Sequence, residues 1–144
     1  MIHADTFNAF VDRTFSFLAT DYKMTQDGVK ISGNAFYDVR YQDSAKVISI
    51  SLETIEDIFQ VILFRLENGK LPDYDDKSRT IHLNQMTTDI LPTVDKPEFA
   101  ANNRFFQDIK PADKTEELIL KSAKELRLCL RYYNTTLEMP TTHR

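Results

Sequence analysis

The sequence predicts an α+β domain in which an antiparallel sheet of four to six strands packs against an N-terminal helix and a long C-terminal helix. Two observations predict this class: apolar residues recur at helical spacing near both ends of the chain, and they alternate with polar residues in several runs between. The length of 144 residues suits a single domain, and we expect residues 1–4 and 135–144 to be frayed.

The first element expected is an amphipathic helix over residues 5–22. Its apolar side chains recur every three or four residues, which places them on one stripe: Phe7, Phe10, Val11, Phe15, Leu18 and Tyr22. Asp5 or Thr6 is expected to cap this helix, because a short polar side chain can accept hydrogen bonds from the first free backbone amides.

Strands are expected in the middle of the chain. The pair Asp27-Gly28 favours a hairpin turn between two short strands within residues 23–34. Three further runs alternate with a period of two residues, which is typical of strands with one buried face. They cover residues 35–41, 47–52 and 80–84.

The run from residue 52 to residue 66 has two possible readings. As a helix it would align seven apolar residues on one face and end at Asn68-Gly69. As a strand it would use residues 53–57 as the turn of a hairpin with the preceding strand. We predict the strand, because residues 58–64 are rich in β-branched and aromatic side chains.

The last third of the chain is expected to contain one short helix and one long helix. Prolines break residues 87–112, but three phenylalanines within the segment indicate that it packs on the domain, with a short helix starting near Pro97. The spacing of Asp113 and Glu116 predicts a capping box that opens the final helix. The face expected to be buried comprises Leu118, Ile119, Ala123, Leu126, Cys129, Leu130 and Tyr133.

The strand expected at 58–66 carries apolar side chains on both faces, so one set needs a cover. The proline-broken segment, a second copy of the chain or a partner protein could supply it. The residues predicted to anchor a protein interface are Phe59, Val61 and Leu63 on this strand, and Leu128 and Tyr132 on the last helix.

Motifs for catalysis or cofactor binding are not found in the sequence. The acidic run at Asp73, Asp75 and Asp76 lacks the glycine and the final glutamate of a calcium loop, and the three glycines are too scattered to hold a phosphate. We therefore expect no metal and no cofactor. A small-ligand site on the polar face of the sheet is a weaker hypothesis, with Arg40 and Arg65 holding an anion and His82 acting as acid or base.

Charge and composition indicate the expected surroundings of the protein. A net charge of −4, with acidic and basic residues interspersed, argues against binding to nucleic acid or an anionic membrane. No apolar run is long enough to cross a bilayer, and the start of the chain does not resemble a signal peptide. The single cysteine, Cys129, fits a reducing compartment, so a cytoplasmic location is expected.

Two segments carry a resemblance to known proteins. Tyr74-Asp75-Asp76-Lys77-Ser78-Arg79-Thr80-Ile81-His82-Leu83 and Lys124-Glu125-Leu126-Arg127-Leu128-Cys129-Leu130-Arg131 resemble a group of small single-domain bacterial proteins. The resemblance implies a helix, an antiparallel sheet and a closing helix, and it favours a strand at 58–66. Some similar small domains act as immunity proteins beside toxins, but the resemblance transfers no catalytic residue.

These observations lead to three functional hypotheses. The first is a non-enzymatic, cytoplasmic protein-binding module, with an immunity-type inhibitor of a toxin as one form. The second is a small-ligand-binding protein or enzyme that uses the polar face of the sheet. The third is a homodimer formed by packing of sheets or helices.

Overall fold

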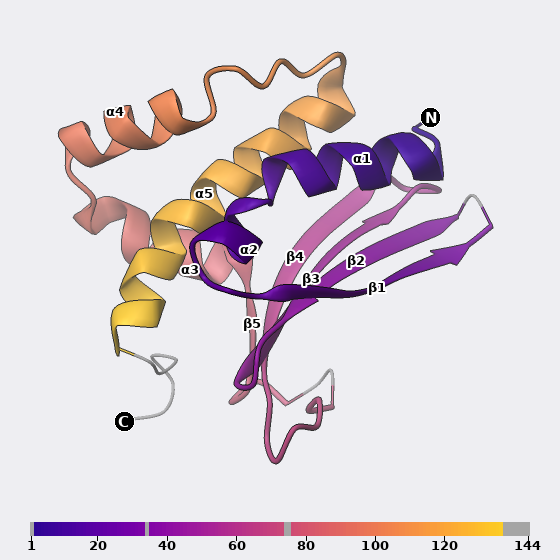
Figure 1. The fold of residues 1–144 in the computed structure, drawn as a ribbon, viewed down its shortest axis with the longest axis horizontal. Helices are drawn as coiled ribbons and strands as arrows, with labels where there is room; N and C mark the ends of the chain where they lie inside the picture. The colour runs from indigo at the N-terminus through magenta and orange to yellow at the C-terminus, as the bar shows by residue number, and fades with distance from the viewer. Residues whose placement is uncertain (1, 34, 74–75, 137–144) are drawn as a thin grey trace.

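The computed structural model describes residues 2–33, 35–73 and 76–136 of the chain. Within these residues, five strands form one antiparallel sheet in the order in which they occur along the chain. Figure 1 shows the helices on one side of the sheet, where α1 (Ala4–Thr14) and α5 (Lys114–Thr136) lie side by side. The predicted α+β architecture, with an N-terminal and a long C-terminal helix, is confirmed.

The N-terminal segment forms two helices instead of the single helix expected. A second, one-turn helix, α2 (Phe17–Thr20), follows α1 after a break at residues 15–16. The break comes directly after Thr14, whose hydroxyl donates to the carbonyl of Phe10 at 2.9 Å. The apolar stripe is buried as predicted, apart from Tyr22, which is half-buried.

The predicted cap of the first helix is wrong. Helix α1 begins at Ala4, so Asp5 and Thr6 lie inside it, and the capping position belongs to His3. The His3 side chain makes no capping hydrogen bond. Residue 4, expected to be frayed, is therefore helical.

Residues 25–32 form one strand, where a hairpin was expected within residues 23–34. Strand β1 (Thr25–Ser32) pairs with β2 (Phe36–Gln42) along its length, with a shift of register between Gln26 and Gly28. The Asp27-Gly28 pair is therefore a β-bulge within the strand. This explains why a turn signal occurs where the chain does not reverse.

The central hairpin is confirmed. Strand β3 (Lys46–Glu53) pairs with β4 (Ile58–Arg65) in a continuous register, and residues 54–57 form the turn. Asp57 in that turn has a positive φ of 56°. The helical reading of residues 52–66 is excluded by this pairing.

The strand expected at 80–84 is short and leads directly into a helix. Strand β5 (Thr80–His82) pairs with β4, and α3 (Leu83–Ile90) starts at the next residue. A 3₁₀ turn, η1 (Leu91–Thr93), ends this segment. Asn84, predicted to lie on a strand, is therefore in the first turn of α3.

Helix α4 (Lys96–Phe105) confirms the short helix expected near Pro97. The carboxylate of its N-cap residue, Asp95, accepts a hydrogen bond from the backbone amide of Glu98 at 3.0 Å. Phe106 follows the helix and is buried in the main core, which confirms that this segment packs on the domain. Phe105 remains exposed and lies under the guanidinium of Arg127, 3.7 Å from its ring centre.

The capping box of the last helix is also confirmed. Asp113 accepts a hydrogen bond from the amide of Glu116 at 2.9 Å, and the Glu116 carboxylate accepts one from the amide of Ala112 at 2.8 Å. The predicted face is buried from Ile119 to Leu130, whereas Leu118 is exposed. The helix continues to Thr136, and residues 137–144 and the side chain of Tyr133 lie outside the described part of the chain.

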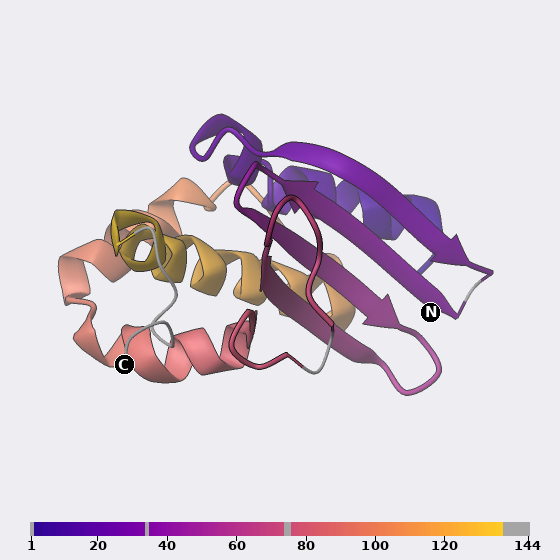
Figure 2. The same ribbon diagram turned by 90° about the horizontal axis from the view of Figure 1, so that it is seen from below.

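The sheet buries side chains on both faces. On the helix side, the main core takes β2, β3 and β4 residues together with α1 and α5. On the opposite side, Val47, Ile62 and Phe64 form a small second cluster, and Leu66 packs against it. The two views show the β4–β5 connection on this opposite side (Figures 1 and 2). The proline-broken segment, one of the covers predicted for this strand, contributes Phe106 to the helix side instead.

Candidate functional site

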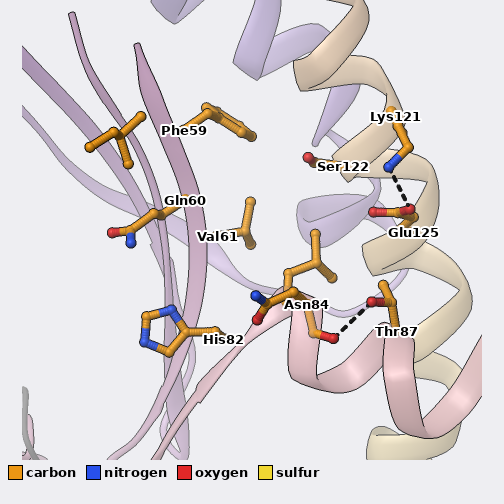
Figure 3. Close-up of a pocket in the computed structure, with 11 residues that line it drawn as sticks. Phe59, Gln60, Val61, His82, Asn84, Thr87, Lys121, Ser122 and Glu125 are labelled. Carbon is orange, nitrogen blue, oxygen red and sulfur yellow. Dashed lines mark hydrogen bonds and ion pairs between the residues drawn. The ribbon is translucent and has the colours of Figure 1, made fainter. Parts of the chain in front are cut away.

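A cavity of about 340 Å³ lies where the sheet meets the helices at the end of β5. Strand β4 forms one wall, α5 the opposite wall and the first turn of α3 the floor, as Figure 3 shows. We call this cavity the β4 groove. It exists because β5 is only three residues long: a longer β5 would run along β4 and fill the space.

The strand wall of the β4 groove has an open edge. Strand β5 pairs only with Ile62, Leu63 and Phe64 of β4. The preceding four residues, Ile58–Val61, pair with β3 on one side and with no described strand on the other. This stretch is therefore a free strand edge within an otherwise paired strand.

The side chains of this edge alternate between the two sides of the sheet. Phe59 and Val61 point toward α5, while Gln60 points away with His82 (Figure 3). Val61 is 4% exposed and Phe59 is half-buried against the main core, with its ring 6.5 Å from that of Phe7. The groove therefore has an apolar inner surface and a polar outer rim.

Helix α5 contributes three polar side chains, Lys121, Ser122 and Glu125. Lys121 and Glu125 form an ion pair at 3.1 Å, with the Lys121 side chain mostly exposed. Ser122 is only 7% exposed and directs its hydroxyl toward the strand wall (Figure 3). The two charges of the ion pair cancel, so this wall presents little net field to a ligand.

Helix α3 contributes its N-terminal turn. Leu83 is buried, and the side-chain amide of Asn84 points into the groove (Figure 3). Thr87 also lines the groove, and its hydroxyl donates to the carbonyl of Asn84 at 2.9 Å. The capping residue of α3, His82, makes no side-chain capping bond.

The groove combines polar and apolar side chains. Its side chains supply amide, hydroxyl and imidazole groups next to an apolar surface. Cys129 lies in the core, where burial raises the pKa of its thiol to about 12, so the thiolate is scarce at neutral pH. Among the described residues, no three histidine, cysteine or acidic side chains are grouped as metal ligands.

The three residues predicted to bind a small ligand do not come together. Arg40 and His82 lie in one row across the sheet, with Ser49 and Ile62 between them, which separates them by three strand spacings of roughly 14 Å in total. Arg65 lies one residue past Phe64, so strand alternation places it on the other face.

The surroundings of Arg40 also argue against that ligand site. Its guanidinium is bound to the carboxylate of Asp38 at 3.0 Å, and Ser49 donates to the same carboxylate at 2.6 Å. Arg40 is thus engaged within the sheet surface. His82 lines the β4 groove, while neither arginine does.

Most of the predicted interface anchors are core residues. Val61, Leu63 and Leu128 are each less than 5% exposed, and Phe59 is half-buried. Leu63 and Leu128 are therefore core residues and not surface anchors, because β4 turns this face toward the helices and α5 is packed between α3, α4 and the sheet. Phe59 and Val61 line the β4 groove. Tyr132 is half-buried on α5, where its hydroxyl donates to Glu98 at 3.1 Å.

The sequence reasoning missed the residues that form the groove opposite β4. The alternating pattern predicts a strand at Asn84, and nothing in the sequence distinguishes Ser122. A signal for α3 was present, because Leu83, Met86 and Ile90 recur at helical spacing, and the first two are buried. No pattern in the sequence indicates that β5 stops opposite Ile62 and leaves the first four residues of β4 unpaired on that side.

Comparison of the chain with protein-family models, curated proteins and solved structures gave no match. The resemblance to small bacterial domains and to immunity proteins therefore receives no support from these comparisons. None of the helices in residues 2–33, 35–73 and 76–136 is long and apolar enough to span a membrane.

Proposed function

We propose that the protein is a binding module that takes an extended segment of another protein as an added strand along Ile58–Val61. The observation that carries this proposal is the free edge of β4 facing a groove walled by two helices. Extended peptides bind to such edges through main-chain hydrogen bonds, and neighbouring side chains give the selectivity.

The backbone of β4 offers hydrogen bonds on the open side. The amide of Arg65 donates to the carbonyl of Arg79 at 2.8 Å, so position 65 faces away from β3. Hydrogen-bonding direction alternates along a strand, so Phe59 and Val61 face the same way. Four residues of extended chain span roughly 13 Å, which sets the length of segment that the edge can pair.

The side chains of the groove define which segment it accepts. A residue of the added strand that points toward α5 meets Phe59, Val61 and Leu83, so an apolar side chain is favoured there. The next residue points to the other side, next to Gln60 and His82, where a polar side chain fits. The partner segment therefore alternates apolar and polar residues.

Of the three sequence-based hypotheses, the protein-binding module is supported best. Arg40, Arg65 and His82, predicted to bind a small ligand, lie apart from one another. The groove instead offers the unpaired backbone edge of β4, which an extended segment of a protein can pair with. Nothing in the described residues points to a toxin as the partner, so the immunity-type role is not part of the proposal.

Two substitutions with matched surroundings test the proposal. Ile58 on β4 is 44% exposed and Val29 on β1 is 43% exposed, so Ile58→Glu and Val29→Glu add the same charge at opposite edges of the sheet. Heptapeptides selected from a displayed random library on the native protein serve as probes. We expect Ile58→Glu to weaken their binding about tenfold and Val29→Glu to leave it unchanged.

The affinities are measured by fluorescence anisotropy, with sedimentation of the unliganded protein beside them. Selection of peptides without alternating apolar residues, or equal weakening by both variants, would overturn the proposal. A native dimer that Ile58→Glu converts to monomer would show instead that a second copy of the chain occupies the edge.

A further inference from the structure

We infer that the β4 groove selects an aromatic side chain of the partner segment, and that Ser122 is the residue that makes room for it. This inference rests on the proposed strand addition and adds which side chain of the partner is recognised. It depends on the size of the cavity, the gap that Ser122 leaves in α5, the ring of Phe59 on the opposite wall and the charge balance of the groove.

The cavity is large enough to hold an aromatic ring. A dry apolar cavity of about 150 Å³ accommodates a benzene molecule. The β4 groove has a volume of about 340 Å³, which leaves room for a ring and for the backbone that carries it. A valine on the added strand would leave much of this space empty, and empty space forfeits contacts with the walls.

Ser122 is a gap in a row of leucines on α5. Positions 118, 122 and 126 lie one above another on the helix, because they are four residues apart, and they carry leucine, serine and leucine. Leu126 is fully buried in the main core, and Leu118 is 42% exposed at the start of the row. A leucine at position 122 would occupy part of the cavity, so the serine keeps the cavity open.

Close packing does not account for the small side chain at Ser122. The next residue, Ala123, is also small, but it is fully buried in the main core, where α5 packs on the rest of the domain. Ser122 lines the cavity instead and directs its hydroxyl into it (Figure 3). The volume that a larger side chain would fill is therefore available to a ligand.

Phe59 supplies an aromatic surface on the opposite wall. Its ring points toward α5 near Ser122 and is half-buried (Figure 3). It already makes an edge contact with Phe7, with 6.5 Å between the ring centres and an interplanar angle of 69°. Paired rings gain more than the burial of their area alone, so a ring from the partner would add a favourable contact on the groove side of Phe59.

The charges of the groove match an uncharged side chain. The acidic and the basic side chain in the described lining, Glu125 and Lys121, form an ion pair at 3.1 Å. A charged side chain of the partner would therefore lose hydration here without gaining an opposite charge. An aromatic ring avoids this cost and buries a large area.

Three heptapeptides test the inference. All alternate serine with valine, and they differ only at the central position, which is valine in one, phenylalanine in the second and alanine in the third. We expect the native protein to bind the phenylalanine peptide about tenfold more tightly than the valine peptide, and the alanine peptide most weakly. Fluorescence anisotropy measures the three affinities.

Two leucine substitutions on α5 locate the selectivity. Ser122→Leu fills the cavity and should abolish the preference for phenylalanine over valine. Glu117→Leu adds the same side chain at an exposed position outside the groove and should leave the preference intact. Because it fills empty space, Ser122→Leu should also raise the urea concentration at which half of the free protein is unfolded. A lowered midpoint would show that position 122 has no room for a larger side chain and would overturn the inference.

The outcomes separate this inference from the proposed function. Equal binding of the three peptides, weakened alike by Ile58→Glu, would overturn aromatic selection and leave strand addition standing. A preference for phenylalanine that persists in Ser122→Leu would overturn the assigned role of Ser122. Binding of none of the three would overturn strand addition, and this inference with it.

Discussion

Two unpaired stretches of strand edge, the outer edge of β1 and Ile58–Val61 of β4, differ in their protection against another strand. The outer edge of β1 is interrupted by the bulge between Gln26 and Gly28, and it carries Lys30 on the face opposite the helices. Both features discourage pairing between edges. The open edge of β4, Ile58–Val61, has neither: its register with β3 is regular and its four residues are uncharged.

This difference indicates that pairing with another strand is hindered at β1 and open at the free edge of β4. An unprotected edge favours uncontrolled association unless its surroundings restrict access. At the β4 edge, α3 and α5 restrict access by enclosing the space in front of the strand. The edge can thus remain unprotected and still be selective, which is what a recognition site requires.

The largest expected effect is on stability: truncating a buried side chain of β4 should lower the free energy of unfolding more than truncating an exposed one of β1. Leu63 of β4 is 3% exposed, so Leu63→Ala should lower the free energy of unfolding by about 2–5 kcal/mol through lost burial and a cavity. Ile31 of β1 is 44% exposed, and Ile31→Ala should cost less than about 1 kcal/mol. Urea denaturation measures both values, and similar losses would show that β1 is packed as tightly as β4.

The second prediction compares two buried ionisable groups of the main core, one on strand β2 and one on helix α5. Tyr41 is hydrogen-bonded to Asp12 of α1 at 3.2 Å, and Cys129 lies on α5. Burial raises the pKa of Tyr41 from 10.0 to about 12 and that of Cys129 from 9.0 to about 12. In both cases the neutral form is favoured by the folded state.

Stability should therefore be complete below the unfolded-state pKa values and fall as the pH rises toward 12, because the unfolded chain releases these protons first. Cys129→Ala should weaken the part of this loss that begins near pH 9, and Tyr41→Phe the part that begins near pH 10. The measurement is the free energy of unfolding against pH. A stability that stays level up to pH 12 in the native protein would contradict the prediction.

The smallest effect on stability is expected at β1. Lys30 is exposed, so Lys30→Val should change the free energy of unfolding by less than about 0.5 kcal/mol. The same change removes the charge that blocks edge pairing, so self-association should increase. Sedimentation velocity compares the variant with Lys30→Arg, which keeps the charge. If the valine variant associates no more than the arginine variant, the bulge alone protects this edge.

The sequence predicted well those elements whose pattern is local. The alternation in β2 and β3 and the capping box of α5 depend on neighbouring residues, and all three elements were confirmed. The dense apolar run of β4 was correctly read as extended, because its β-branched and aromatic residues outweighed a competing helical period. The turn signal at Asp27-Gly28 failed, since the same residue pair serves a bulge.

The site was less predictable because it depends on tertiary placement. A sequence does not tell which face of a strand the helices will cover, so the predicted anchors Val61 and Leu63 prove to be buried. Predicting the groove requires knowing that β5 ends opposite Ile62, and this end is set by the start of α3. His82 was singled out for its imidazole, yet its position as the last residue of β5 is what places it in the groove.

The direct passage from β5 into α3, without a loop, makes the groove sensitive to insertions. Adding two residues between His82 and Leu83 would let the fifth strand continue along its neighbour and complete the sheet from within. The protein would then cover the proposed binding edge itself and gain internal hydrogen bonds there. The number of residues at this junction, more than the identity of any side chain, decides whether β4 is paired along its whole length or keeps an open edge.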